Sequence, residues 1–147
     1  MRKYVRIVVA LVLLTYGLIR LGVGSALFGQ VNGWIDFPAF HEPLIDIGNF
    51  LAKSTEKQII PFSVAGYVSY IALMGLVLLV GAFRVLRNLT HGLSLIATFI
   101  VMYSLLFFNF QTINPKIIHL GVCIILFGVL LGLKNIDISS KKDLELG

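Results

Sequence analysis

Four long stretches of this chain consist almost entirely of apolar residues. They comprise residues 5–28, 62–83, 91–110 and 115–133. A helix that crosses a bilayer needs about 20 mostly apolar residues, so each stretch predicts one membrane-spanning helix. The pattern therefore predicts an all-α integral membrane protein in which residues 1–134 form a four-transmembrane-helix bundle.

The connection between the first two stretches, residues 29–61, carries apolar side chains that need burial. Leu44, Ile47 and Leu51 recur at helical spacing, with polar residues between them. This pattern predicts an extracytoplasmic loop with a short amphipathic helix at the outer membrane interface. Trp34 suits an interfacial anchor. Two roles remain open for the helix: it caps the bundle, or it forms a lid over a ligand cavity.

The first stretch has two interpretations. Its basic start, its apolar run and the small residues Gly24 and Ala26 match the pattern of a cleavable signal peptide. Arg20 interrupts the approach to such a cleavage site, however, and the apolar character continues to Phe28. We therefore expect an uncleaved first span.

Polar residues mark the expected ends of the later spans. Asn88 or Thr90 is expected to cap the third helix, and Asn114 to cap the fourth, with Pro115 in its first turn. Residues 135–147 are short and charged, which predicts a disordered tail on the cytoplasmic side.

Composition excludes a soluble globular domain. The 147 residues are 58% hydrophobic and 13% charged, whereas soluble domains carry about 25% charge. The net charge of +5 does not indicate nucleic-acid binding, because the basic residues are divided among short segments beside the spans. The single Cys123 cannot form an intrachain disulfide, and no Cys or His spacing predicts a metal ion, haem or other cofactor.

The distribution of basic residues predicts the orientation of the spans. With the N-terminus inside, the cytoplasmic segments contain eight Lys and Arg residues: Arg2, Lys3, Arg6, Arg84, Arg87, Lys134, Lys141 and Lys142. The outer segments contain three: Lys53, Lys57 and Lys116. The positive-inside rule then favours a multi-pass protein with both termini in the cytoplasm.

Arg20 is the charged residue that lies away from the ends of the predicted spans. A charge at the centre of a membrane helix costs at least about 2.5–3.5 kcal/mol, so it must reach water or a partner. One interpretation has Arg20 extend to the outer headgroups. The other pairs it with a carboxylate of the outer loop, Asp36 or Glu42 in preference to Asp46.

Several further polar residues are candidates to line a ligand-binding or polar pocket near Arg20. Tyr16 lies one turn before it, Tyr70 lies early in the second span, and His119 lies near the outer start of the fourth. His41 stands beside Glu42 in the outer loop, but the spacing of these histidines does not predict a metal site. The sequence contains no nucleophile with an adjacent base and no paired intramembrane carboxylates, so it predicts no catalytic residues.

Small residues indicate where helices can approach closely. Gly22, Gly24 and Ala26 lie on the first span, and Gly128 and Gly132 form a Gly-x-x-x-Gly motif on the fourth. Such contacts can form within the bundle or between two copies of the chain, and both remain open.

Two stretches resemble the DoxX-like family of small four-helix bacterial membrane proteins. Residues 16–21, Tyr-Gly-Leu-Ile-Arg-Leu, resemble the family's Gly-x-x-Lys-Leu ending of the first span, with Arg20 in the lysine position. Residues 75–81, followed by Arg84, resemble its glycine- and leucine-rich second span and basic exit. The family often has a glutamate early in that span, where this chain has Tyr70 and Ile71.

This resemblance implies an inner-membrane protein associated with quinone-linked sulfur oxidation or oxidative-stress complexes. The leading prediction is an accessory, non-catalytic subunit of a membrane redox or envelope-stress system, in contact with the lipid bilayer and with a membrane protein or a second copy of itself. A small transporter or channel and a quinone-linked oxidoreductase subunit are the alternatives.

Overall fold

The computed structural model describes the backbone of residues 2–111 and 115–145 and the side chains as far as Lys134. It is all-helical in these residues, as predicted. Five α-helices and one short 3-10 helix follow one another: α1 (Arg2–Val31), η1 (Pro38–Phe40), α2 (His41–Ser54), α3 (Val64–Leu86), α4 (Gly92–Phe110) and α5 (Ile117–Glu145).

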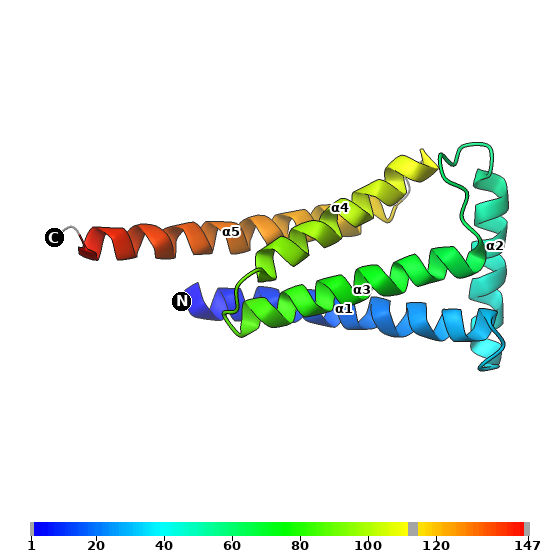
Figure 1. Ribbon diagram of the computed structural model, residues 1–147, viewed down its shortest axis with the longest axis horizontal. Helices are drawn as coiled ribbons and strands as arrows, with labels where there is room; N and C mark the ends of the chain where they lie inside the picture. Colours follow the sequence, from blue (N-terminus) through cyan, green and yellow to red (C-terminus); the bar gives the residue numbers. More distant parts are fainter. Residues whose placement is uncertain (1, 112–114, 146–147) are drawn as a thin grey trace.

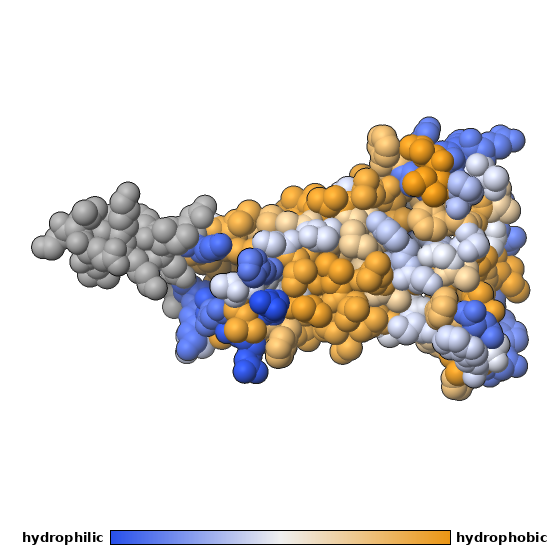
Figure 2. Space-filling view, in the orientation of Figure 1, coloured by the Kyte–Doolittle hydropathy of each residue, from blue (hydrophilic) through white to orange (hydrophobic). Residues whose placement is uncertain are grey.

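Four helices run along the molecule, and α2 lies across one end of them (Figure 1). The four are α1, α3, α4 and the part of α5 up to Lys134, and each is long and apolar enough to cross a membrane. On the face shown in Figure 2, a broad apolar belt covers the middle of these helices, with hydrophilic residues toward both ends. The chain is therefore a multi-pass membrane protein with a four-helix bundle.

The N-terminus and the end of α5 lie at the end of the bundle opposite α2 (Figure 1). We call this the N-terminal end and the other the α2 end. Between them lies a core of buried apolar side chains. Its largest fully buried members are Phe99, Leu13, Met74, Leu78, Ile96 and Val68.

Glycine determines how closely α1 and α3 approach. A Cβ atom at Gly24 would lie 2.7 Å from the backbone nitrogen of Ala72, and one at Gly17 would lie 2.7 Å from that of Leu79. A Cβ at Gly75 would meet the backbone of α1 at Leu21. Any larger residue at these positions would force the two helices apart.

The amphipathic helix predicted between the first two spans is confirmed as α2. Leu51 is buried, and Leu44 and Ile47 pack against the core, so the apolar stripe faces the bundle. Trp34 is 72% exposed and meets Phe28 edge-on; its role as an interfacial anchor remains a prediction.

Asn109 attaches the α2 end of α4 to the segment before α3. Its side chain accepts a 2.7 Å hydrogen bond from the backbone nitrogen of Ile60 and donates a 3.0 Å bond to the carbonyl oxygen of the same residue. This paired bond satisfies an amide that is 8% exposed.

The helix ends correct two predictions. Helix α4 begins after His91, which has a left-handed φ of 65° and whose side chain makes no capping hydrogen bond, so neither Asn88 nor Thr90 is the cap. Helix α5 continues to Glu145 through residues predicted to be disordered. A helix that has already formed extends at little cost per added residue. The expected cap at Asn114 lies outside the described residues.

Candidate functional site

Arg20 turns its guanidinium into the bundle, among three aromatic rings. Its central carbon lies 4.1 Å from the ring centroid of Tyr103, 4.9 Å from that of Tyr16 and 5.7 Å from that of Phe99. A cation above an aromatic face is attracted by the electrons of the ring, by about 0.5–2 kcal/mol depending on hydration. The rings thus offset part of the cost of holding a charge inside a membrane span.

Helical periodicity assembles this group from two elements. Tyr16 and Arg20 are four residues apart on α1, and Phe99 and Tyr103 are four residues apart on α4. Residues at this spacing share one helix face, so each helix presents two of the four side chains. Tyr16 also meets Phe99 edge-on at 6.4 Å between ring centroids.

Arg20 does not pair with the loop carboxylates that the sequence predicted as its partners. Asp36 lies beyond the end of α1, where its Oδ1 is 2.7 Å from Nε2 of His41 and accepts a 3.0 Å bond from Gln30. Glu42 is exposed on α2, and no ion pair between Arg20 and a carboxylate is found in the described part of the chain. In the structure the Arg20 guanidinium lies against the rings of α4 and α1 instead; its extension to the outer headgroups remains a prediction.

One nitrogen of Arg20 is left without a hydrogen bond. Nη1 is buried, and no described residue accepts a bond from it. A buried donor without an acceptor costs about 1–3 kcal/mol, and more when it is charged. The site therefore has an unmet requirement for a hydrogen-bond acceptor.

A pocket of about 280 Å³ lies beside Arg20 in the half of the bundle nearest α2. Its walls come from α1, α3 and α4; Ile47 of α2 and Lys116, just before α5, complete it. Its residues are Ile19, Arg20, Val23, Gly24, Leu27, Ile47, Tyr67, Val68, Ile71, Tyr103, Leu106 and Lys116. This lining contains two cations and no acid.

The pocket opens on the side of a membrane span. Ile19 and Val23 line it and are themselves 56% and 47% exposed. Both belong to the apolar part of α1, whose surroundings are the hydrocarbon of a bilayer. A ligand can therefore enter from the lipid with an apolar tail and bring a polar group to Arg20.

The other predicted site residues have separate positions. His119 is exposed and stacks on Tyr16, with ring centroids 6.2 Å apart, so it lies next to the Arg20 group. Tyr70 donates a 2.9 Å hydrogen bond to the carbonyl oxygen of Met102 and is absent from the lining of the Arg20 pocket. It connects α3 to α4.

Asp36 and His41 form a second, exposed polar group at the α2 end. Hydrogen bonds from His41 and then from Gln30 hold the pKa of Asp36 below its ordinary value of 3.8. The group fixes the turn between α1 and α2 and lies outside the Arg20 pocket.

Sequence reasoning did not single out Phe99 and Lys116 as site residues. The signal for Phe99 was its four-residue spacing from Tyr103, which matches the spacing of Tyr16 and Arg20. In the sequence, Lys116 was used only to predict the orientation of the spans. Lys116 lies at the pocket because the chain just before α5 contacts α4. There the backbone carbonyl oxygen of Lys116 accepts a 3.2 Å hydrogen bond from the hydroxyl of Tyr103.

Comparison with known proteins finds no relative of this chain. No family model, no curated protein and no solved structure matches the chain.

Proposed function

We propose that this protein is a small membrane protein that binds, beside Arg20, the acceptor-bearing headgroup of an amphiphile. The observation that carries the proposal is the buried Nη1 of Arg20, which has no hydrogen-bond partner in the described residues and lies at a pocket open to lipid. A group with lone pairs would complete the hydrogen bonding of the guanidinium. The apolar walls would hold the start of an acyl or isoprenoid chain.

The charge of Arg20 favours an anionic headgroup, and among these a carboxylate. A guanidinium pairs with a planar carboxylate through two parallel bonds, which suits a narrow site with one arginine. A quinone is the second candidate, because its carbonyl oxygens can accept hydrogen bonds from the guanidinium, and Tyr67 and Tyr103 add aromatic rings to the lining.

The pocket supports binding in preference to catalysis or transport. Its lining holds no Ser, Cys, His, Asp or Glu, the side chains that most often act as nucleophiles or bases. Fully buried apolar residues, Leu13, Met74 and Leu78 among them, fill the bundle between its two ends, where a channel would need polar groups and water. An accessory, non-catalytic subunit is therefore our preferred role.

The cellular setting comes from the sequence. The resemblance to the DoxX-like family suggests a bacterial inner membrane and a redox or envelope-stress system. The basic residues suggest that both termini lie in the cytoplasm. In a Cys123→Ser background, an impermeant thiol reagent applied to intact cells should label Glu56→Cys and not Arg2→Cys. The reverse labelling would overturn the orientation.

Ligand binding can be tested on the purified full-length protein in detergent. Oleate and decylubiquinone serve as the carboxylate and quinone probes, and native mass spectrometry measures their affinities. Arg20→Met should weaken oleate binding by about tenfold or more, because a hydrogen bond to a charged group contributes about 1.5–3 kcal/mol. Arg20→Lys should retain part of the affinity, since it keeps the charge and loses the planar fork.

Arg87→Met is the matched control. Arg87 also stacks on a ring, 5.7 Å from that of Phe83, but it does not line the Arg20 pocket. Its replacement should leave oleate binding unchanged. Equal losses in the Arg20 and Arg87 variants would overturn the proposal, whereas binding of decylubiquinone alone, lost in Arg20→Met, would select the quinone.

A further inference from the structure

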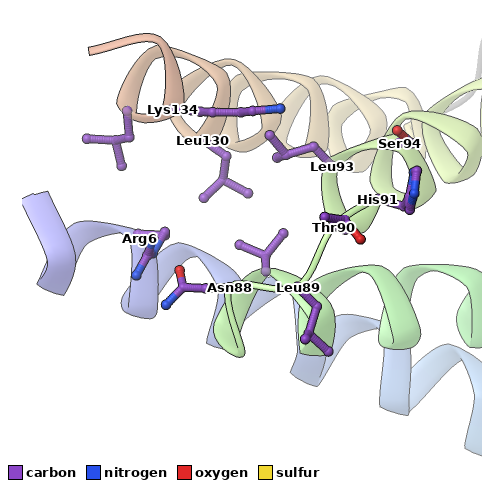
Figure 3. A pocket seen from close by; sticks show the side chains of 12 residues that line it. Arg6, Asn88, Leu89, Thr90, His91, Leu93, Ser94, Leu130 and Lys134 are labelled. Atoms are coloured by element: carbon purple, nitrogen blue, oxygen red, sulfur yellow. The ribbon is translucent and has the colours of Figure 1, made fainter. Parts of the chain in front are cut away.

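A second pocket lies at the N-terminal end of the bundle, on the far side of the apolar core from Arg20. Its volume is about 300 Å³, and it lies between the start of α1, the turn from α3 to α4 and the part of α5 near Lys134. Figure 3 shows Arg6 and Asn88 on one side of it and Lys134, Leu130 and Leu93 on the other.

Two cations and no acid are among the lining residues of this pocket. Arg6 contributes one, and its Nε is buried without a hydrogen-bond partner in the described part of the protein. Lys134 contributes the other. Two like charges at one pocket repel each other, and an anion between them would offset that repulsion. A neighbouring arginine, Arg84, already donates a 2.8 Å bond to the carbonyl oxygen of Thr90.

The start of α4 adds hydrogen-bond donors to the same pocket. Gly92, Leu93 and Ser94 line it, and as the first residues of the helix their N–H groups have no acceptor within it. No side chain caps this helix, because His91 stands in the cap position with a left-handed backbone. The N-terminus of a helix also carries partial positive charge, which attracts anions.

The turn that presents these donors is held in place. A Cβ atom at Gly92 would lie 2.9 Å from the backbone nitrogen of Val85, so the turn packs directly against α3. Arg84 fixes its middle through Thr90. The donors of α4 are thus positioned before any ligand arrives.

The surroundings of the pocket match the headgroup layer of a membrane. Arg6 and Lys134 lie where the apolar parts of α1 and α5 reach the end of the bundle, and Arg84 and Arg87 lie at the same end of α3. Leu130 and Leu133 line the pocket toward the apolar belt. A ligand there would meet cations at its head and leucines below.

We propose that this pocket binds the phosphate of an anionic phospholipid, held by Arg6, Lys134 and the N-terminus of α4. Donors arranged on several sides suit a tetrahedral phosphate with several oxygens better than a planar carboxylate. Basic pockets between membrane helices are known to receive such headgroups. This inference does not depend on the ligand of Arg20.

The test uses the full chain in detergent, with native mass spectrometry to measure bound lipid. The probes are phosphatidylglycerol, which is anionic, phosphatidylcholine, whose phosphate is balanced by a cation, and inorganic phosphate. Phosphatidylglycerol should bind most tightly. The double replacement Arg6→Met with Lys134→Met should reduce its affinity by about tenfold or more.

The control removes the same charge from residues that do not line the pocket. Arg2 and Arg87 are exposed at the same end of the bundle, and Arg2→Met with Arg87→Met should change the affinity by less than about twofold. Equal losses in the two double variants would mean general attraction to a basic surface and would overturn the site. Oleate binding beside Arg20 should be unchanged in both, which separates this test from the previous one.

A second variant tests the pocket without removing a cation. Ser94→Asp places an acid in the first turn of α4, where a negative charge favours the helix, so folding should be retained. The acid should repel phosphate and weaken phosphatidylglycerol binding. Unchanged binding in this variant, or equal affinity for phosphatidylcholine, would contradict the proposal. Displacement of the lipid by millimolar inorganic phosphate would assign the pocket to a free phosphate compound and overturn the lipid assignment.

Discussion

Two parts of the bundle contain several glycines, and they use them differently. Where α1 meets α3, Gly17, Gly24 and Gly75 bring the two backbones into direct contact. On α5, in contrast, a Cβ atom at Gly121, Gly128 or Gly132 would have nothing within 4 Å in the described structure.

Burial shows the same difference. In the most apolar stretch of α3, 33% of the residues are buried, against 17% in that of α5. Helices in a bilayer gain nothing by hiding apolar surface from lipid, so packing and hydrogen bonds determine which of them associate closely. A motif of small residues therefore permits two helices to approach closely. Whether they do so depends on the surface of the neighbouring helix.

The substitution with the largest expected effect tests whether the closely packed helix α3 contributes more to stability than α5. Leu78 on α3 is fully buried, and Leu78→Ala should lower the free energy of unfolding by about 2–5 kcal/mol, because it leaves a cavity. Ile125 on α5 is 67% exposed, and Ile125→Ala should change it by no more than about 0.5 kcal/mol. Chemical unfolding in detergent measures both. Similar losses would mean that α5 is packed as closely as α3.

A smaller effect is expected when a side chain is added to the glycine positions. Gly24→Val should destabilise by about 1–3 kcal/mol, because its side chain would meet the backbone of α3. Gly128→Val makes the same chemical change at an open position and should be nearly neutral. Thermal unfolding in detergent compares the two. A large loss in Gly128→Val, with Gly24→Val unaffected, would show that α5 has a close partner and α1 does not.

Local patterns were sufficient to predict the spans and α2. The apolar stretches and the spacing of Leu44, Ile47 and Leu51 are properties of short segments, and they appear unchanged in the structure. The start of α4 was not predictable in this way. His91 has a left-handed backbone, and Gly92 beside it packs against α3, a contact between two helices that a local pattern does not contain.

The partner of Arg20 was not predictable for a related reason. Ion pairing with Asp36 or Glu42 assumes that a buried cation finds the nearest acid. Close packing of α1 instead places Arg20 next to the aromatic face of α4, with Tyr103 4.1 Å away. Periodicity gives the face of each helix, but which faces meet depends on the glycine contacts between α1 and α3.

The smallest expected effect comes from the exposed polar group of Gln30, Asp36 and His41. It tests whether this group, in addition to the glycine contacts with α3, fixes the position of α1. Because the pKa of Asp36 is held below 3.8 in the folded protein, its carboxylate stabilises the turn above that pH. This contribution disappears as the pH falls through the lowered pKa. In His41→Ala the pKa of Asp36 should rise toward 3.8, which an NMR titration of its carboxyl carbon measures. The group is fully exposed and α1 is already fixed by its packing on α3, so amide exchange at residues 36–41 should increase while the melting temperature stays unchanged. A clear fall in the melting temperature of His41→Ala at pH 6 would show that this polar group, and not the glycine contact alone, holds α1 in place.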